Sequence, residues 1–324
     1  MEMISIDIQN DPDSKWNERL LQSELGTIYQ TKDFAAAQTV IGGKSNYVSF
    51  LNQNGKIVGQ LLVISYSRFL NKGFFGKILD KISSTKGQTY IWVYGPVIFD
   101  LECTSEITES LYKFLISKKW KIQGSNHPLS NECLSKIDKS FKIKERATFL
   151  INLSKSREEI WNKLDKHSVR KNIRRSEARG VTIKKMEKSD FSTYLKIFAE
   201  TGKTTPFPSS EIAEKWWEKM EPVGHNGFLA YENETPIGGM AITTFNGYVN
   251  EFGIVRSKRD YSAKLYSQDL LKWKVIDWSI SKNFRYYDLT GVSPNSTNEK
   301  ELGIYRYKKK WGGELMKYNL ITFN

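Results

Sequence analysis

An order of predicted elements that occurs twice constrains the fold of this chain more than any other feature. In the first half, residues 47–52 alternate as a strand does, and residues 57–65 form a second strand pattern. The dipeptide Asn54-Gly55 between them is a strong hairpin signal. A helical pattern at 106–118 and a short strand at 120–124 follow. The first half therefore predicts a hairpin, then a helix, then a strand.

The second half repeats this order. Asn246-Gly247 is again a turn signal between two strand patterns. Strands are predicted at 227–232, 237–245, 248–255 and 285–289, with one long helix at 263–282 before the last of them. A repeat of this kind predicts an α/β fold of two similar domains, each a mixed sheet flanked by helices. The layout resembles the GNAT-type acyltransferase domain.

The boundary between the two domains is predicted near Leu153. A strand pattern at 148–153 ends there, and Ser156 with Glu159 forms a capping box that opens a helix. We expect a first domain at 1–152 and a second at 153–324, with the last strand packing on the first domain. No coiled-coil heptads follow the boundary, so no protruding helical arm is expected.

One helix, predicted from Ser156 to Gly180, carries the densest positive charge of the chain. Like charges at spacings of three and four residues repel by some tenths of a kcal/mol each, and a bound polyanion would relieve that repulsion. The alternative is a solvated helix face. The residues expected to contact the anion are Lys163, Lys166, Arg170, Lys171, Arg174 and Arg175.

The net charge of the chain also indicates an anionic partner. The 49 Lys and Arg residues exceed the 36 Asp and Glu residues, which gives +13. An excess of this size is typical of proteins that bind nucleic acid, a diphosphate-bearing metabolite or an acidic membrane face. The alternative is a lysine-rich proteome that places lysine wherever a surface tolerates it.

Metal chemistry and membrane insertion are not expected. The two cysteines, Cys103 and Cys133, form no CxxC pair, and the three histidines form no HExxH motif. The amino terminus is interrupted by charges, unlike a secretory signal, and no run of 18 apolar residues occurs. We expect a cytoplasmic protein without a metal or redox cofactor.

Two stretches resemble the Fem family of aminoacyl transferases, which move amino acids from tRNA onto peptidoglycan precursors. Residues 160–183 contain a tryptophan, then arginines, then an alanine and a Gly-Val, as at the opening of the family's second domain. Residues 287–313, which read YDLTGV…LGIYRYKKKWGGE, are similar to the closing signature of the family. The resemblance implies that the first domain holds the acceptor and the second holds the donor and the catalytic centre.

The resemblance implies catalytic roles for three residues. Lys308 matches the lysine at the acyl-transfer centre, where an ammonium stabilises the oxyanion, and Tyr307 would hold it by a cation–π contact. Asp100 resembles an acid near the substrate amine, as a proton acceptor or orienter. The alternatives are a solvated basic turn at Lys308 and a turn or helix cap at Asp100.

Substrate-binding residues are implied in the same way. Lys32 and Phe34 resemble a Gln-x-Lys-x-Trp element that binds the nucleotide diphosphate of the precursor, with phenylalanine in place of tryptophan. Lys203 and Phe207 stand where the family has an arginine and a tyrosine, and lysine lacks the bidentate grip of arginine on phosphate. Phe252 completes the expected substrate-binding group.

The resemblance implies an aminoacyltransferase that moves an amino acid from aminoacyl-tRNA to an amine of a peptidoglycan-precursor peptide. We expect a monomer whose precursor is nucleotide-linked or, at the membrane surface, lipid-linked. One alternative is an acyl-CoA transferase on the same fold. Residues 256–263 lack the glycines that let backbone N–H groups approach a pyrophosphate, which argues against CoA. The other alternative is a non-catalytic nucleic-acid-binding protein, although no such motif occurs.

Overall fold

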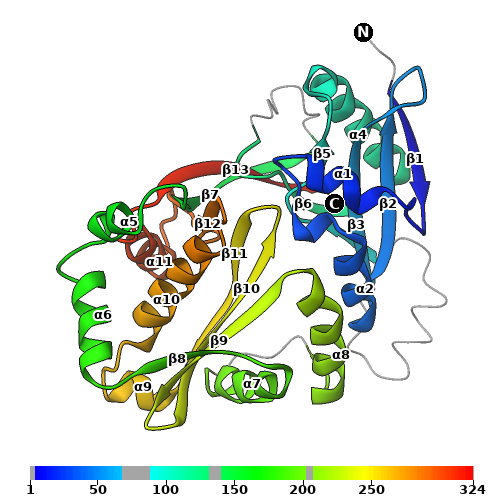
Figure 1. Ribbon diagram of the computed structural model, residues 1–324. Helices are drawn as coiled ribbons and strands as arrows, with labels where there is room; N and C mark the ends of the chain where they lie inside the picture. Colours follow the sequence, from blue (N-terminus) through cyan, green and yellow to red (C-terminus); the bar gives the residue numbers. More distant parts are fainter. Residues whose placement is uncertain (1–3, 68–87, 131–139, 202–206, 324) are drawn as a thin grey trace. The chain divides into compact units, whose positions relative to one another are not determined.

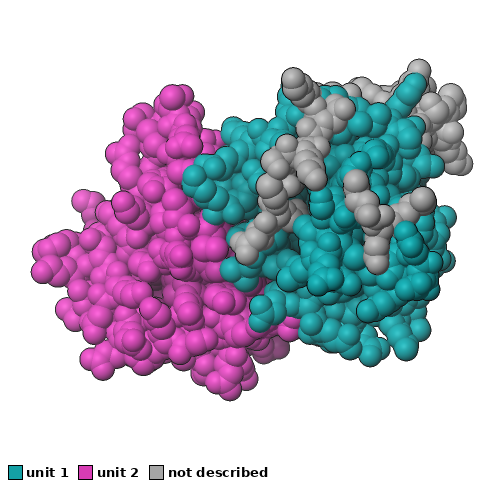
Figure 2. All heavy atoms as spheres, turned by 90° about the horizontal axis from the view of Figure 1, so that it is seen from above, with its two compact units in different colours: residues 1–146, 317–324 teal, residues 147–316 magenta. Residues whose placement is uncertain are grey.

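The structure, a computed structural model, describes residues 4–67, 88–130, 140–201 and 207–323. Its internal contacts divide the chain into two compact units. Unit 1 comprises Met1–Arg146 and Lys317–Asn324, and unit 2 comprises Ala147–Met316 (Figure 2). Each unit has its own hydrophobic core.

Unit 1 contains the hairpin predicted at Asn54-Gly55. Gly55 adopts a φ of +73° in the turn, a conformation that glycine reaches without strain. The strands are β1 (Ser5–Gln9), β2 (Lys44–Leu51), β3 (Ile57–Ser67), β4 (Gln88–Trp92), β5 (Val97–Ile98) and β6 (Lys121–Ser125). The helices are α1 (Trp16–Gln22), α2 (Lys32–Val40) and α4 (Thr104–Lys118), with 3-10 turns at Ile28–Gln30 and Leu101–Cys103.

Unit 2 contains the turn predicted at Asn246-Gly247, where both residues have positive φ. Its strands are β8 (Thr182–Lys185), β9 (His225–Glu232), β10 (Thr235–Phe245), β11 (Tyr248–Arg256) and β12 (Tyr286–Asp288), while β7 (Lys142–Asn152) and β13 (Glu314–Phe323) belong partly to each unit. Its helices are α5 (Arg157–Lys163), α6 (Val169–Ala178), α7 (Phe191–Glu200), α8 (Ser210–Met220), α9 (Lys258–Ser262), α10 (Ser267–Ser281) and α11 (Glu299–Lys309) (Figure 1).

The two units follow one plan, as the repeat predicted. In unit 1, β1 to β4 pair antiparallel in sequence order, and α4 leads to β6, which runs parallel to β4. In unit 2, β8 to β11 pair antiparallel, and α10 leads to β12, which runs parallel to β11. An antiparallel strand then follows in each sheet, β13 beside β6 and β7 beside β12. The duplicated α/β fold is confirmed.

Neighbouring glycines on β10 let helices approach both faces of the unit 2 sheet. A Cβ atom on Gly238 would lie 2.7 Å from the Ser267 hydroxyl of α10. A Cβ atom on Gly239 would lie 2.8 Å from the ring of Tyr194 on α7. Because successive strand residues point to opposite faces, α10 and α7 cover the two sides of this sheet. The buried helix α10 carries the polar residues of the site described below.

The basic helix predicted from Ser156 to Gly180 is wrong as a single helix, because residues 164–168 separate α5 from α6. The capping box at Ser156 is present, and Gly180 follows α6 with a φ of +74°. The break comes from Asp165, whose carboxylate accepts hydrogen bonds from the backbone N–H and the hydroxyl of Ser168. Its own N–H donates to the carbonyl of Lys310 at 2.9 Å. Such local side-chain bonds compete with helix formation.

The helix predicted at 263–282 is present but starts four residues later, since α10 spans Ser267–Ser281. Lys264 and Tyr266 adopt positive φ angles of 52° and 59°, so α9 ends before α10 begins at Ser267. The longest helices described, α4 and α10, have 15 residues each, and both pack within their own unit. No coiled-coil arm occurs among the described residues.

Candidate functional site

Lys308 extends from the last turn of α11 toward the loop that follows β12. Its Nζ donates to the carbonyl oxygens of Thr290 at 3.2 Å and Gly291 at 3.3 Å. These two carbonyls are the acceptors of Lys308 among the described residues. An ammonium has three N–H donors, so one donor remains for a ligand. The side chain is half-buried. Lys308 is therefore held in place and can still donate.

The turn that presents these carbonyls is built around Asp288. Thr290 has a φ of 58°, which is costly for a β-branched residue. Asp288 holds this conformation, because its Oδ1 accepts the Thr290 N–H at 2.6 Å. The carboxylate is fully buried and also accepts from Tyr248 Oη at 2.9 Å and Asn250 Nδ2 at 3.2 Å. The Asp-Leu-Thr-Gly turn is thus a pre-formed support for Lys308.

A buried ion pair lies in the same region of unit 2. Lys272 of α10 is 1% exposed, and its Nζ lies 2.6 Å from Glu251 Oε1 of β11. The Tyr287 hydroxyl donates to the same carboxylate oxygen at 3.1 Å. The Lys272 ammonium also lies 5.3 Å from the ring centre of Tyr307 and 5.2 Å from that of Trp311. Aromatic faces thus complete the surroundings of this buried cation.

A second carboxylate of α10 orients Tyr307. The Tyr307 hydroxyl donates to Asp269 Oδ1 at 2.8 Å, and Asn172 Nδ2 donates to the other oxygen at 2.8 Å. Burial and the Asp269 charge raise the pKa of Tyr307 well above its ordinary value. Burial likewise raises the pKa of Asp269. Tyr307 is therefore a neutral phenol with a fixed direction.

The expected cation–π contact between Tyr307 and Lys308 is wrong. The ammonium above Tyr307 belongs to Lys272, whereas Lys308 binds backbone carbonyls. Neighbouring residues on a helix point about 100° apart, so Tyr307 and Lys308 face different partners. Tyr307 therefore does have a lysine above its ring, but that lysine is Lys272.

Burial lowers the pKa of Lys308 below the ordinary lysine value of 10.5. The nearby Lys272 charge also lowers the pKa of Lys308, whereas the charges of Glu251 and Asp288 raise it. The charges of the Lys272–Glu251 ion pair and of Asp288 therefore act on Lys308. These residues form one polar cluster in unit 2, on β11, β12, α10 and α11.

Phe207 and Phe252 meet in an aromatic cluster of unit 2. Both rings contact Trp216 of α8, with ring centres 5.4 Å and 5.5 Å away. A register shift in the β10–β11 pair leaves Phe252 as an extra residue, and it stays 44% exposed. His225 lies within this cluster, and burial lowers its pKa to about 3, so the ring is neutral. The cluster offers an exposed aromatic surface at Phe252.

The residues of unit 1 that were expected to bind the acceptor substrate lie at or near the first residues of helices. Lys32 is the exposed first residue of α2, and Phe34 packs edge-on against Tyr29 at 5.4 Å. Asp100 accepts the Glu102 N–H at 3.1 Å and caps a 3-10 turn, which is the structural alternative considered for it. Its role as a proton acceptor stays a prediction. Lys203 lies outside the described residues.

The predicted anion-binding residues divide between the two short helices. Lys163 ends α5, Lys166 is an exposed residue of the connecting segment, and Lys171 is exposed on α6. The other three are arginines of α6 with contacts of their own: Arg170 to Asn162, Arg174 over the Trp161 ring and Arg175 over the Tyr266 ring. These residues do not form the continuous face that a single helix would have.

A buried carboxylate caps the start of α10. Asp260 is fully buried in α9, and its Oδ1 accepts the N–H of Ser267, the first residue of α10, at 3.1 Å. Its other oxygen pairs with Arg256. The positive end of a helix dipole and its free N–H groups attract anions, and here Asp260 already supplies the negative charge. The ion pair with Arg256 compensates this charge, so the start of α10 is capped from within the chain.

Sequence reasoning missed the polar residues of the cluster outside α11. Asp269 and Lys272 are three residues apart, so they share one side of a helix, and apolar residues such as Leu270 and Leu271 stand between them. Charged residues at this spacing beside apolar ones were the available signal for both. Glu251 gave no such signal, because isolated acids in strands are common at solvent-exposed positions. Asp288 lies in the segment that resembles the closing signature, but no role was expected for it.

Two findings concern other classes of function. No group of three His, Cys, Asp or Glu side chains that could hold a metal ion is found in the described parts of the chain. Among these same residues, no helix is long and apolar enough to cross a membrane.

Comparisons with known proteins identify the fold. No protein-family model and no curated protein sequence matches the chain. A solved structure of FemX matches with a TM-score of 0.64 and 13% identity over 97% of this chain and 96% of that one. L-PGS from Bacillus licheniformis matches with a TM-score of 0.58 and 11% identity over 98% of this chain and 94% of that one. A tandem GNAT protein from the clavulanic acid biosynthesis pathway matches with a TM-score of 0.53 and 9% identity over 98% and 97% of the two chains.

Proposed function

We propose that this chain, which has the Fem-like duplicated GNAT fold, is an acyltransferase that moves an amino acid from aminoacyl-tRNA to an amine of a peptidoglycan-precursor peptide. The observation that carries the proposal is the arrangement of Lys308. Its ammonium is fixed by two carbonyls, retains one donor and lies beside a buried ion pair. A pre-oriented cation of this kind is suited to stabilising the oxyanion of acyl transfer.

The reaction needs little beyond positioning and charge stabilisation. The neutral amine of the acceptor attacks the ester carbonyl carbon, and a tetrahedral intermediate with a negative oxygen forms. Lys308 donates to that oxygen. The bond to the ribose oxygen then breaks, an amide remains, and the amine proton passes to the leaving hydroxyl. The ester is already activated, so the proposal requires no metal or redox cofactor.

Asp260 favours an ester donor over an acyl-CoA donor. In the duplicated fold, the start of α10 in unit 2 is the helix end that a pyrophosphate would need, and the buried carboxylate occupies it. The charge on α5, α6 and the segment between them supports an RNA donor instead. Contacts of these lysines and arginines with phosphates would be salt-sensitive and independent of RNA sequence.

The pH dependence of transfer should follow the protonation of Lys308. Burial lowers the pKa of Lys308, so its ammonium is lost at a lower pH than an ordinary lysine loses its own. Since only the charged form stabilises an oxyanion, activity should fall on the alkaline side, with an apparent pKa below 10.5. In Lys308→Arg the charge persists above pH 12, and the fall should move upward.

The measurement is the ratio of wild-type to Lys308→Arg rates across the alkaline range. The ratio removes the titration of the acceptor amine, which both proteins share. A ratio that does not change with pH would contradict the role of the Lys308 charge.

The choice of donor is tested by equilibrium binding. We expect a stable amide-linked analogue of aminoacyl-tRNA to bind with a strong salt dependence, and acetyl-CoA to show no binding at similar concentrations. Tight binding of acetyl-CoA without binding of the tRNA analogue would favour the acyl-CoA alternative.

A further inference from the structure

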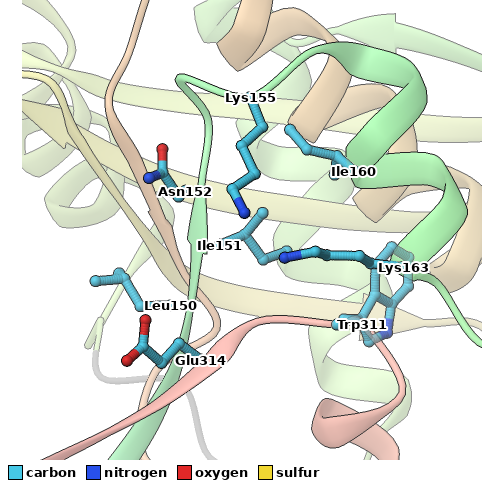
Figure 3. A pocket seen from close by; sticks show the side chains of 9 residues that line it. Leu150, Ile151, Asn152, Lys155, Ile160, Lys163, Trp311 and Glu314 are labelled. Atoms are coloured by element: carbon cyan, nitrogen blue, oxygen red, sulfur yellow. The ribbon is translucent and has the colours of Figure 1, made fainter.

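A small pocket of about 100 Å³ lies in unit 2 between the end of β7, helix α5 and the residues that follow α11 (Figure 3). Leu150 and Asn152 line it from β7, and Trp311 and Gly312 line it from the chain after α11. Its charged lining residues are Lys155, Lys163 and Glu314. The polar cluster around Lys308 does not include this pocket.

Two glycines bring the chain close enough to form the pocket. Gly312 has a φ of +72°, and a Cβ atom there would lie 2.7 Å from the carbonyl oxygen of Lys163. A Cβ atom on Gly313 would lie 3.1 Å from the backbone of Leu150. Side chains at these positions would therefore force α5 and β7 away from the chain. The fully buried Trp311 anchors the same segment.

The ammonium groups of Lys155 and Lys163 approach each other over the pocket (Figure 3). Contact with Lys155 and its positive charge lower the pKa of Lys163. Neither lysine has a carboxylate within ion-pair distance in the described parts of the chain. The charges of Glu159 and Glu314 act on Lys163 in the opposite direction to that of Lys155. The two ammonium groups still face each other, and an anion between them would remove their repulsion.

We propose that this pocket binds a phosphate group. Its size suits a compact oxyanion, and two lysines against one glutamate leave its lining positive. Lysine binds phosphate as a point charge with three donors, so two converging lysines can hold several phosphate oxygens. This inference names a ligand group and does not require acyl transfer. The phosphate can come from an RNA backbone that follows α6 or from a free phosphate or nucleotide.

The test compares Lys155→Gln/Lys163→Gln with Lys142→Gln/Lys144→Gln. The control pair removes two exposed lysines of β7 that belong to unit 1. In the first arm, the midpoint of thermal unfolding is measured in sodium phosphate and in sodium chloride at equal ionic strength. Phosphate stabilises folded proteins in general, so all three proteins should gain some stability. Wild type and control should gain more than the pocket variant, which lacks the specific site.

In the second arm, binding of uncharged tRNA is measured against salt concentration. Loss of one phosphate contact should reduce the slope of log affinity against log salt by roughly one in the pocket variant and leave the control unchanged. If the pocket variant differs from the control in thermal unfolding, the ligand of the pocket is a free phosphate or nucleotide. If it differs in tRNA binding alone, the ligand is a phosphate of the RNA backbone.

The proposal is overturned if the pocket variant matches wild type in both arms, or if wild type responds to neither ligand. A phosphate effect together with no tRNA binding would contradict the proposed donor and still support this pocket. Failure of the two proposals is therefore distinguishable.

Discussion

Replacing Lys308 by alanine is expected to lower the rate of acyl transfer by roughly 30- to 1,000-fold, or about two to four kcal/mol of transition-state stabilisation. The physical reason is the loss of an ammonium that the Thr290 and Gly291 carbonyls hold in position. Because the oxyanion exists only in the transition state and intermediate, kcat should fall much more than KM changes. Single-turnover transfer rates measure the effect.

Lys309 provides the control for this substitution. It is the neighbouring lysine of α11 and is exposed, so Lys309→Ala removes the same charge from the same helix. Rates in Lys309→Ala should stay near wild type. Equal losses in the two variants would show that general positive charge matters rather than the held ammonium, and wild-type rates in Lys308→Ala would remove Lys308 from the site.

Replacing Glu251 by glutamine is expected to destabilise the protein by about three to five kcal/mol. The change leaves the Lys272 ammonium, which is 1% exposed, without the carboxylate 2.6 Å away. Removing one member of a buried ion pair leaves an uncompensated buried charge, which costs more than the pair itself contributes. Urea unfolding followed by circular dichroism measures the change in the free energy of unfolding.

An exposed ion pair between α10, which carries Lys272, and α6 gives a matched control. Lys274 Nζ lies 3.2 Å from Glu177, and both side chains are more than 40% exposed. Glu177→Gln should change the free energy of unfolding by less than about one kcal/mol. The double variant Lys272→Met/Glu251→Gln should recover part of the loss, because no buried charge remains. If Glu251→Gln and Glu177→Gln have the same small effect, the pair is not buried as described.

The duplicated fold was predictable because local signals repeat along the chain. Asn54-Gly55 and Asn246-Gly247 set two hairpins through backbone conformations that these residues favour, and the structure contains both turns. The capping box at Ser156 is likewise a local signal, and it is present. Signals of this kind act over a few residues and do not depend on the rest of the fold.

The break between α5 and α6 was not predicted because it involves a contact far along the chain. Asp165 donates its N–H to the carbonyl of Lys310. Helical periodicity runs through this break, so it predicts one helix where the structure has two. Tertiary contacts override propensity at such positions.

The candidate site was predicted only where the family resemblance reached it. Tyr307 and Lys308 came from the closing signature, and the structure places both in a polar cluster whose ion pair, Lys272 with Glu251, no motif indicated. Lys272 and Glu251 are far apart in sequence, and their 2.6 Å contact exists only because α10 packs on β11. Pairing of this kind follows from the packed sheet and not from any local pattern.

Transfer of a labelled amino acid is the measurement that tests the central claim most directly. The protein is mixed with tRNA charged with a labelled amino acid and a peptidoglycan-precursor peptide, and in parallel with labelled acetyl-CoA and the same peptide. The account predicts a labelled, alkali-stable amide from charged tRNA in wild type, much less in Lys308→Ala, and none from acetyl-CoA. Labelled product from acetyl-CoA, together with no transfer from any charged tRNA, would contradict it.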